Sequence, residues 1–336
     1  MSKTIEDNNE YKWNSTFSFL MAMIGAAVGL GNIWRFSYVL YSNGGGAFFI
    51  PYVIAILIMG IPFLILEYGL GATFKNSLSN ILKGIRPQLE VIGWITAFLV
   101  FLVLTYYVVI MGWDLIYFLL SFFKGWGSNP DAYFMSNIVV GSDNLNNLGT
   151  FVLPTLLATI FIWILIWFIS HRNLNEGVGK ANRILTPLLF LMMIIIVAFA
   201  VTLPGSSLGI STLFTPDWNA ILNPNIWVAA FGQILFSLSI GMTITLAYAS
   251  YLPDETNIPR SALTVAIANS SFEVFTAVGV FSILGFMSTS SNVPTSSTGV
   301  TGNDIVAYAQ QFKGYRYVYG AAGPNSFDCS GFTMYV

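Results

Sequence analysis

Apolar residues gather in seven long runs along the chain, separated by short polar segments. Because a helix of about 20 residues crosses the roughly 30 Å hydrocarbon layer of a bilayer, runs of this length predict membrane spans. We expect spans near residues 15–40, 47–70, 91–121, 151–170, 184–203, 226–251 and 262–287. The polar residues 1–12 lack the short apolar core of a signal peptide, so we expect the first span to remain in the mature protein.

The composition also indicates a membrane location. Hydrophobic residues make up 55% of the 336 positions and charged residues only 8%, about a third of the charged share usual in soluble domains. We therefore expect an all-α polytopic membrane protein that has the lipid bilayer as a partner. The 13 Lys and Arg are nearly balanced by 15 Asp and Glu, which excludes a basic surface for nucleic acid. With one cysteine and one histidine, we expect no disulfide within the chain and no transition metal site.

Basic residues fall mostly in alternate loops, and cytoplasmic loops of membrane proteins are enriched in Lys and Arg. Among the loops between spans, one face has only Lys124. The other holds Lys3, Lys12, Lys75, Lys83, Arg86, His171, Arg172, Lys180, Arg183 and Arg260. We therefore expect a protein of the plasma membrane with residues 1–12 in the cytoplasm and the C-terminal tail outside. His171 would then be a solvated residue of a cytoplasmic loop.

The middle of the first span is interrupted by Gly25, Gly29, Gly31 and Asn32, and Arg35 follows at or near membrane depth. Glycine costs about 1 kcal/mol in a helix relative to alanine, and a central arginine roughly 2.5 kcal/mol or more. Small residues can serve tight helix packing. Alternatively, the helix is broken, and its unpaired backbone groups line a binding site.

The sixth span is interrupted too, because residues 232–242 (GQILFSLSIGM) place a glutamine, two serines and two glycines in mid-membrane. If the architecture is an inverted repeat, the first and sixth spans are the leading helices of its two five-helix halves. Paired interruptions in corresponding spans point to the midplane binding site of a transporter. This pairing favours the broken-helix interpretation.

Several motifs together resemble the neurotransmitter:sodium symporter family, which has the leucine transporter fold. They are GAAVGLGNIWRF, NGGGAFFIPY and GIPFLILEYGLG in the first two spans, TYYVVIMGW at 105–113, GQILFSLSIG at 232–241, YASYL at 248–252 and ANSSFEV at 268–274. The resemblance covers residues 12–290 and implies a symporter region at 13–287, with five spans of the first half and two of the second. Family members carry eleven or twelve spans, so we expect this chain to be incomplete as it stands.

The resemblance implies two sodium sites and sodium as co-transported ion, with no other cofactor. The first sodium would be held by the Ala27 carbonyl and the side chains of Asn32, Ser237 and Asn269. The second would take carbonyls of Gly25 and Val28, with its other ligands on an eighth span. Neutral oxygens suit a hard monovalent cation that must also be released.

The resemblance also implies a substrate site at the two breaks. Its residues would be Ala26, Ala27, Leu30, Gly31, Val103, Tyr107, Phe236, Ser237, Ser239 and Met242. Tyr107 would bond a substrate carboxylate and Phe236 would cap the site. Gly29 stands where relatives that transport amines have an aspartate, which pairs with the substrate ammonium. Because Gly29 has no carboxylate, we expect the substrate to be an amino acid with a carboxylate of its own. The thioether of Met242 favours an apolar substrate side chain.

Four further polar residues receive roles from the resemblance. Glu273 stands where chloride-dependent relatives have a serine, and the resemblance places it near Tyr52, Gln233 and Ser237. Its fixed charge therefore predicts transport that is independent of chloride. Glu67 would bond the unwound backbone of the sixth span; a plain helix-to-helix hydrogen bond is the alternative. Arg35 and Gln233 would belong to an external gate.

The tail has a different character. Residues 288–303 are rich in Ser and Thr and predict a linker. Residues 304–336 resemble the start of an NlpC-type cell-wall cysteine peptidase, a short and incomplete α/β-type segment, through the phrase FDCSGF around Cys329. In that family the cysteine is the nucleophile and a histidine lowers its pKa. That histidine would follow later than residue 336, and His171 is expected on the opposite face, so we predict no hydrolase activity.

Three functions stay open at this point. The first is sodium-coupled amino-acid symport by alternating access. The second is a membrane-anchored, extracytoplasmic cell-wall endopeptidase fragment, and the third a non-functional fusion of the two families. A membrane anchor for a peptidase needs only one apolar helix and no ion ligands. The many positions that match the symporter family therefore favour the symporter. The sequence leaves the oligomeric state and the particular amino acid undecided.

Overall fold

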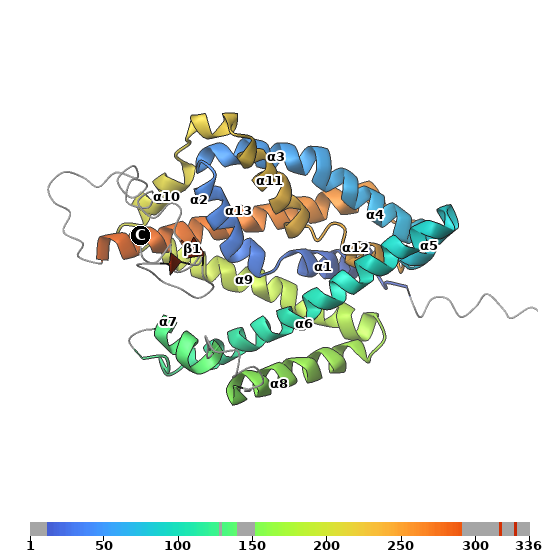
Figure 1. The fold of residues 1–336 in the computed structure, drawn as a ribbon, viewed down its shortest axis with the longest axis horizontal. Coiled ribbons are helices and arrows are strands. Elements are labelled where there is room, and N and C mark those ends of the chain that lie inside the picture. The colour runs from blue at the N-terminus through green and yellow to red at the C-terminus, as the bar shows by residue number, and fades with distance from the viewer. Residues whose placement is uncertain (1–11, 128–129, 140–151, 291–315, 318–325, 328–336) are drawn as a thin grey trace, which may run out of the picture. The chain divides into compact units, whose positions relative to one another are not determined.

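The computed structural model describes residues 12–127, 130–139, 152–290, 316–317 and 326–327. Helices dominate this part of the chain (Figure 1). The chain divides into two compact units, one made of residues 1–108 and 163–290 and the other of residues 109–162 and 291–336. The predicted all-α membrane architecture is confirmed.

In the first unit the helices run in the order α1 (Thr16–Ala27), α2 (Phe36–Ser42), α3 (Phe49–Ala55), α4 (Ile61–Phe74) and α5 (Leu78–Ile85), then the start of α6 (Glu90–Ser121). After the end of α8 (Leu153–Ser170) come α9 (Lys180–Val201), α10 (Ser206–Phe214), α11 (Pro224–Ser237), α12 (Ile244–Ala249) and α13 (Ile258–Ser290). Short 3-10 turns lie at Gly46–Phe48, Pro87–Leu89 and Trp218–Leu222, and π-helical turns at Gly31–Arg35, Ile56–Gly60 and Asn175–Gly179.

Five stretches in the described ranges are long and apolar enough to cross a membrane: Gly46–Phe74, Pro87–Ser121, Leu153–Ser170, Asn175–Val201 and Ile258–Thr289. A sixth candidate is the pair Thr16–Ala27 and Gly31–Ser42, which is bent by 60° at its break. These six correspond to six of the seven predicted spans.

The predicted span at 226–251 differs from this pattern. It consists of α11 and α12, separated by six residues without regular helix. Neither helix alone is long enough to cross a bilayer. The gap overlaps the interruption predicted at residues 232–242, and three residues in it have positive φ, Ser239, Gly241 and Thr243, which interrupt the helix.

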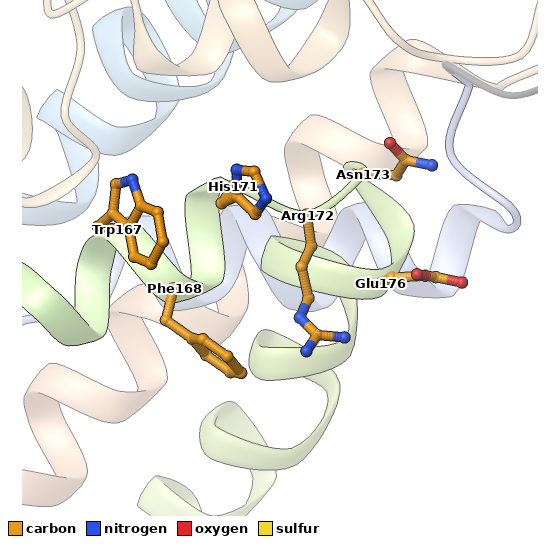
Figure 2. A pocket seen from close by; sticks show the side chains of 6 residues that line it. All are labelled: Trp167, Phe168, His171, Arg172, Asn173 and Glu176. Atoms are coloured by element: carbon orange, nitrogen blue, oxygen red, sulfur yellow. The ribbon is translucent and has the colours of Figure 1, made fainter.

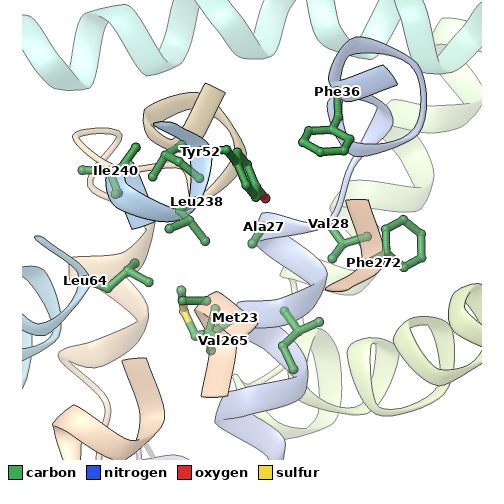
Figure 3. Packing of buried hydrophobic residues seen from close by; sticks show 14 of the residues in the cluster. Met23, Ala27, Val28, Phe36, Tyr52, Leu64, Leu238, Ile240, Val265 and Phe272 are labelled. Carbon is green, nitrogen blue, oxygen red and sulfur yellow. The ribbon is translucent and has the colours of Figure 1, made fainter. Parts of the chain in front are cut away.

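Helix α13 forms the centre of the first unit. It packs against α1, α4, α9 and α10. Of its most apolar window, 44% is buried, against 11% for α6 and for α8. Figure 3 shows the surrounding core, in which side chains from α1, α4 and α13 meet residues of the α11–α12 region. Helix α13 is therefore more deeply buried in the protein than α6 or α8.

Helix α13 also continues past the predicted domain boundary, because it reaches Ser290 although the linker was expected to start at residue 288. The hydroxyl of Thr289 donates to the carbonyls of Gly285 (3.1 Å) and Phe286 (2.9 Å). Such bonds to the preceding turn satisfy the polar side chain within a helix. A Ser/Thr-rich composition therefore did not fix where the helix ends.

The second unit contains the rest of α6, the turn α7 (Pro130–Tyr133), the π-helical turn Phe134–Val139 and the start of α8. Trp113 contacts Phe134 edge-on with ring centres 5.3 Å apart, and Tyr117 stacks on Trp126. The unit also has two parallel strands of two residues each, β1 (Arg316–Tyr317) and β2 (Ser326–Phe327). The predicted nucleophile Cys329 lies outside the described residues.

Candidate functional site

The first helix break lies at Val28 and Gly29. Helix α1 begins at an N-cap, where the Ser15 hydroxyl accepts from the Ser18 amide, and ends at Ala27. Val28 takes an extended conformation, and its amide still bonds the Ile24 carbonyl at 2.7 Å. The last carbonyls of a helix have no intrahelical partner. The break therefore leaves backbone oxygens of the last turn of α1 without intrahelical partners, and the Ala26 carbonyl accepts from Ser239 Oγ.

The second break runs from residue 238 to residue 243, between α11 and α12. Ser239 and Thr243 have φ of 53° and 61°, in a region that residues with a side chain rarely adopt. Strain of this kind costs about 1–3 kcal/mol per residue and concentrates at functional sites. Gly241, with φ of 81°, takes the same region without steric cost. The surrounding contacts must hold this segment in its unwound form.

A buried polar cluster connects the two breaks. The side-chain amide nitrogen of Asn32 donates to Asn269 Oδ1 at 2.8 Å and to Ser237 Oγ at 3.3 Å, and Asn269 also donates to Ser237. Asn32 and Ser237 are 2% and 3% exposed and Asn269 is fully buried. Three of the four predicted ligands of the first sodium are thus in mutual contact, although up to 237 positions separate them in sequence.

Glu273 lies at the centre of this cluster and is fully buried. Its Oε1 accepts from Gln233 Nε2 at 2.7 Å and from Asn32 Nδ2 at 3.3 Å, and its Oε2 accepts from the Tyr52 hydroxyl. A buried carboxylate is costly unless such donors surround it. These three neighbours come from three different helical segments, so Glu273, itself on the seventh predicted span, joins that span to the first, second and sixth.

Arg35 extends this network. Its guanidinium donates to Gln233 Oε1 and lies 4.8 Å from the centre of the Phe236 ring. The amide of Gln233 therefore stands between the positive charge of Arg35 and the negative charge of Glu273. The structure brings together the two predicted gate residues and the predicted cap Phe236, which is 45% exposed.

Three contacts show how the predicted substrate residues meet at the breaks. A Cβ built on Gly29 would lie 3.4 Å from the Tyr107 hydroxyl, and one built on Gly31 would lie 2.5 Å from the Phe236 ring. Both rings therefore approach the broken first span closely. Ser239 Oγ donates to the Ala26 carbonyl at 3.4 Å.

The remaining predicted substrate positions are less well defined by contacts. Ala27 is 7% exposed and packs in the core, while Leu30, Val103 and Met242 are partly buried. The structure brings the backbone of Met242 to Ser239, whose carbonyl accepts from its amide at 3.4 Å. Their roles in substrate binding stay predictions.

The two predicted carbonyl ligands of a second sodium lie at the end of α1, beside α9. Val28 is 5% exposed, and a Cβ on Gly25 would lie 2.3 Å from Asn182 Oδ1 and 2.7 Å from Thr186 Oγ1. Thr186 also donates to the Met21 carbonyl at 3.2 Å. The sequence did not indicate that Asn182 and Thr186 lie against Gly25. Their spacing of four on a helix places them on one face, which is the only local signal.

Glu67 on α4 bonds the second break, as predicted. Its Oε1 accepts from the Gly241 amide at 2.8 Å and its Oε2 from the Thr245 hydroxyl. One carboxylate therefore spans the unwound segment and the first turn of α12. The sequence identified Glu67 but not its second partner Thr245.

The sequence of this chain is similar to that of a known protein family. A model of the sodium:neurotransmitter symporter family matches residues 10–134 and 123–314. The second match crosses the predicted linker and enters the segment predicted as a partial peptidase. The NlpC-type resemblance of residues 304–336 stays a prediction.

Individual relatives match over most of this chain. An uncharacterized sodium-dependent transporter of Methanocaldococcus jannaschii is 41% identical over 282 residues, which are 84% of this chain and 57% of the relative. The sodium- and chloride-dependent GABA transporter 2 of Mus musculus is 31% identical over 342 residues, 92% of this chain and 57% of the relative. The chain thus spans little more than half the length of these relatives.

The fold has a counterpart among solved structures. The crystal structure of MhsT in complex with L-phenylalanine matches with a TM-score of 0.69 and 31% sequence identity, over 82% of this chain and 62% of MhsT. The family match covers well over half of the chain, and the helix breaks and buried polar cluster lie within it. The chain belongs to the sodium:neurotransmitter symporter family.

Proposed function

We propose that this chain carries the substrate site and the first sodium site of a symporter that couples sodium to the uptake of an amino acid. The observation that carries the proposal is the buried contact of Asn32, Ser237 and Asn269 beside the two helix breaks. Membership of a sodium-dependent family supports sodium as the co-transported ion. Alternating access would move the two broken helices around this site.

The donor set suits sodium. Hydroxyl and amide oxygens and a backbone carbonyl are neutral ligands, which bind a monovalent cation and still let it leave. The Asn32 amide nitrogen now points at the oxygens of Ser237 and Asn269, which shows that both oxygens converge on one partly positive group. For sodium to bind, the Asn32 amide would turn its oxygen toward the ion. The second sodium site at Gly25 and Val28 is part of the same proposal.

The proposed substrate is an amino acid with an apolar side chain. Gly29 leaves no acidic group to pair with a substrate ammonium at that position, and the Tyr107 hydroxyl lies beside it as a donor for a carboxylate. Phe236 and Met242 offer apolar surface around the rest of the molecule. MhsT, with its bound L-phenylalanine, supports a substrate of this class.

Chloride independence is the third part of the proposal. Glu273 places a fixed negative charge among three donors, the Tyr52 hydroxyl and the Gln233 and Asn32 amides. A chloride ion beside this carboxylate would be repelled. We expect binding and uptake to persist unchanged when gluconate replaces chloride, and a loss of activity would refute this part.

Equilibrium binding tests the site directly. The purified 336-residue chain in nanodiscs is titrated with a panel of radiolabelled amino acids in sodium or in choline. We expect saturable binding of an apolar amino acid in sodium only. Because coupling is reciprocal, the amino acid should raise sodium affinity by the same factor that sodium raises amino-acid affinity.

Two variants test the proposed sodium site. Asn269→Ala should weaken sodium binding at least about tenfold, since a lost ligand or charge-assisted bond is worth about 1.5–3 kcal/mol. Asn80→Ala, at an exposed position on α5, is the matched control and should bind like the unmodified chain. Amino-acid binding that is equal in sodium and choline would reject sodium coupling.

A further inference from the structure

The turn after α8 carries a cavity of about 480 Å³ that the transport site does not use. Its lining residues are Trp167, Phe168, His171, Arg172, Asn173 and Glu176, and Figure 2 shows their side chains around it. All six belong to the first unit. The volume falls within the range of about 300–1,000 Å³ that is usual for small-molecule sites.

Two pairs of side chains, each joining a residue of the last turn of α8 to one just after the helix, build one wall. His171 stacks on Trp167 with ring centres 5.2 Å apart, and the Arg172 guanidinium lies 4.7 Å from the centre of the Phe168 ring. Both pairs are four residues apart, the spacing at which side chains meet along a helix. The helical hydrogen bonding continues through this turn, because the His171 amide bonds the Trp167 carbonyl at 2.8 Å.

The facing wall comes from the π-helical turn that begins at Asn175. A Cβ on Gly177 would lie 2.2 Å from the Ile169 carbonyl oxygen, so only glycine lets this turn approach the end of α8 so closely. Glu176, the residue before Gly177, is one of the residues that line the cavity. The loop is also tied to the N-terminal segment, since Asn175 Nδ2 donates to the Lys12 carbonyl at 2.7 Å.

The position of the cavity is that of a membrane–water interface. It lies between two candidate spans, Leu153–Ser170 and Asn175–Val201. Trp167 and Phe168 are 63% and 53% exposed at the end of the first of these. Exposed tryptophan at a span end is typical of the headgroup region.

The charges in the cavity are balanced and unpaired. Within the described residues, neither Arg172 nor Glu176 takes part in an ion pair. Phe168 covers the flat face of the Arg172 guanidinium, which leaves its N–H edge available, and a guanidinium edge binds phosphate through paired hydrogen bonds. The Glu176 carboxylate accepts hydrogen bonds and suits a primary ammonium.

We propose that this cavity binds the headgroup of a phosphatidylethanolamine lipid of the surrounding bilayer. Arg172 holds the phosphate, Glu176 accepts from the ammonium, and the rings of Trp167 and Phe168 lie against the glycerol and the first carbons of the acyl chains. The formal charges of Arg172 and Glu176 cancel, so a zwitterionic headgroup fits better than an anionic one. Phosphatidylcholine has the same charges but no N–H group to donate to Glu176.

Native mass spectrometry of the detergent-purified chain tests this assignment with phosphatidylethanolamine, phosphatidylcholine and phosphatidylglycerol of identical acyl chains. We expect phosphatidylethanolamine to bind about tenfold more tightly than phosphatidylcholine, because one charge-assisted hydrogen bond is worth about 1.5 kcal/mol or more. Phosphatidylglycerol should bind less tightly than phosphatidylethanolamine. Inorganic phosphate and soluble phosphoethanolamine should not displace the lipid, and displacement by either at equal concentration would identify a phosphate site rather than a lipid site.

Variants separate the two charges. Glu176→Gln should bring the affinity for phosphatidylethanolamine down to that for phosphatidylcholine, whereas Arg172→Gln should weaken all three lipids by about tenfold or more. Arg260→Gln removes an exposed basic residue outside the cavity and is the matched control. The ratio between two lipids is measured within one variant, so a general loss of folding cannot imitate the effect of Glu176→Gln. Tighter binding of phosphatidylglycerol, or an unchanged ratio in Glu176→Gln, would overturn the proposal.

Discussion

The amide group of Asn32 is bonded at both ends. Its oxygen accepts from the Gly29 amide at 2.8 Å, and its nitrogen points to oxygens of Ser237, Asn269 and Glu273. The sequence motif predicted that Asn32 belongs to the site. It could not predict which end faces the site, because the three partners lie more than 200 positions away and only the fold brings them near.

Glu273→Ser is the sharpest test at the scale of single residues. The change removes the carboxylate from three donors, and a small anion can then satisfy them. We expect amino-acid binding by this variant to require chloride, whereas the unmodified chain binds equally in chloride and gluconate. Glu255→Ser, at an exposed loop position, serves as control. Chloride-independent binding by Glu273→Ser would remove the assigned role of this carboxylate.

At the scale of elements, a glycine triplet after α2 links the first broken span to the segment before α11, the start of the second. The Gly46 amide bonds the Thr215 carbonyl, and the Asp217 amide bonds the Gly44 carbonyl, each at 3.0 Å. This antiparallel bridge joins the segment after α2 to the segment before α11. Gly44 and Gly45 have φ of 91° and 57°, which explains why glycine is needed there. The sequence shows the triplet but not its partner strand.

Gly46→Ala should destabilise this link. A Cβ at Gly46 would lie 2.4 Å from the Phe214 carbonyl oxygen, which is backbone and cannot turn aside. We expect a loss of about 1–3 kcal/mol in the free energy of unfolding, as for other overpacked positions. Gly69→Ala on α4, where nothing lies within 4 Å, should instead add up to about 1 kcal/mol. Thermal unfolding of both variants measures the contrast, and equal midpoints would contradict it.

The ion pairs of Asp254 with Lys75 and Lys12 form a second link between elements, and their contribution to stability depends on pH. Hydrogen bonds from Lys75 and Lys12 lower the pKa of Asp254, in the loop between α12 and α13. A lowered pKa in the folded state contributes stability above the unfolded value, near pH 3.9, and loses it as the pH falls through the folded value. Asp254→Asn should therefore unfold earlier than the unmodified chain at pH 6.

The same difference should shrink as the pH falls through the lowered folded pKa of Asp254, and it should vanish once the carboxyl is protonated in both states. It should also shrink in 1 M salt, because the three side chains are solvent-accessible and salt screens such pairs. Thermal unfolding across this pH range checks both points. A constant difference from pH 6 to pH 3 would show that the ion pairs contribute nothing.

For the whole molecule, the structure groups the basic loops as the sequence predicted. Lys12 and Lys75 both reach Asp254, and the backbone amide of Asn14 donates to Asn175 in the loop after α8. These loops therefore share one end of the first unit. Which end faces the cytoplasm stays a prediction from the distribution of Lys and Arg.

The single cysteine offers a direct test of orientation. If residues 1–12 are cytoplasmic and seven segments cross the membrane, Cys329 lies outside. A membrane-impermeant maleimide should then label Cys329 in intact cells. In the double variant Cys329→Ser, Arg86→Cys, labelling should require permeabilised cells. The opposite pattern would invert the topology.

The tail gives a further prediction for the whole chain. The one histidine of the chain, His171, is exposed in the loop after α8. That loop is predicted on the opposite membrane face from Cys329. Without an imidazole to take up the thiol proton, the nucleophile stays weak. Purified chain should therefore not cleave cell-wall peptides. Cleavage that Cys329→Ala abolishes would establish a peptidase instead.

The sequence by itself determined the membrane character, the places where the first and sixth spans are interrupted and the residues at those interruptions, because hydropathy and glycine placement are local properties. The break that it predicted within residues 232–242 lies at 238–243, because α11 continues to Ser237 and residues with positive φ follow it. Only the tertiary structure decided that Asn32 also donates to Glu273, and that Gly177 lets the turn of Glu176 approach the end of α8. Such contacts depend on how distant helices pack, and local patterns carry no information about that packing.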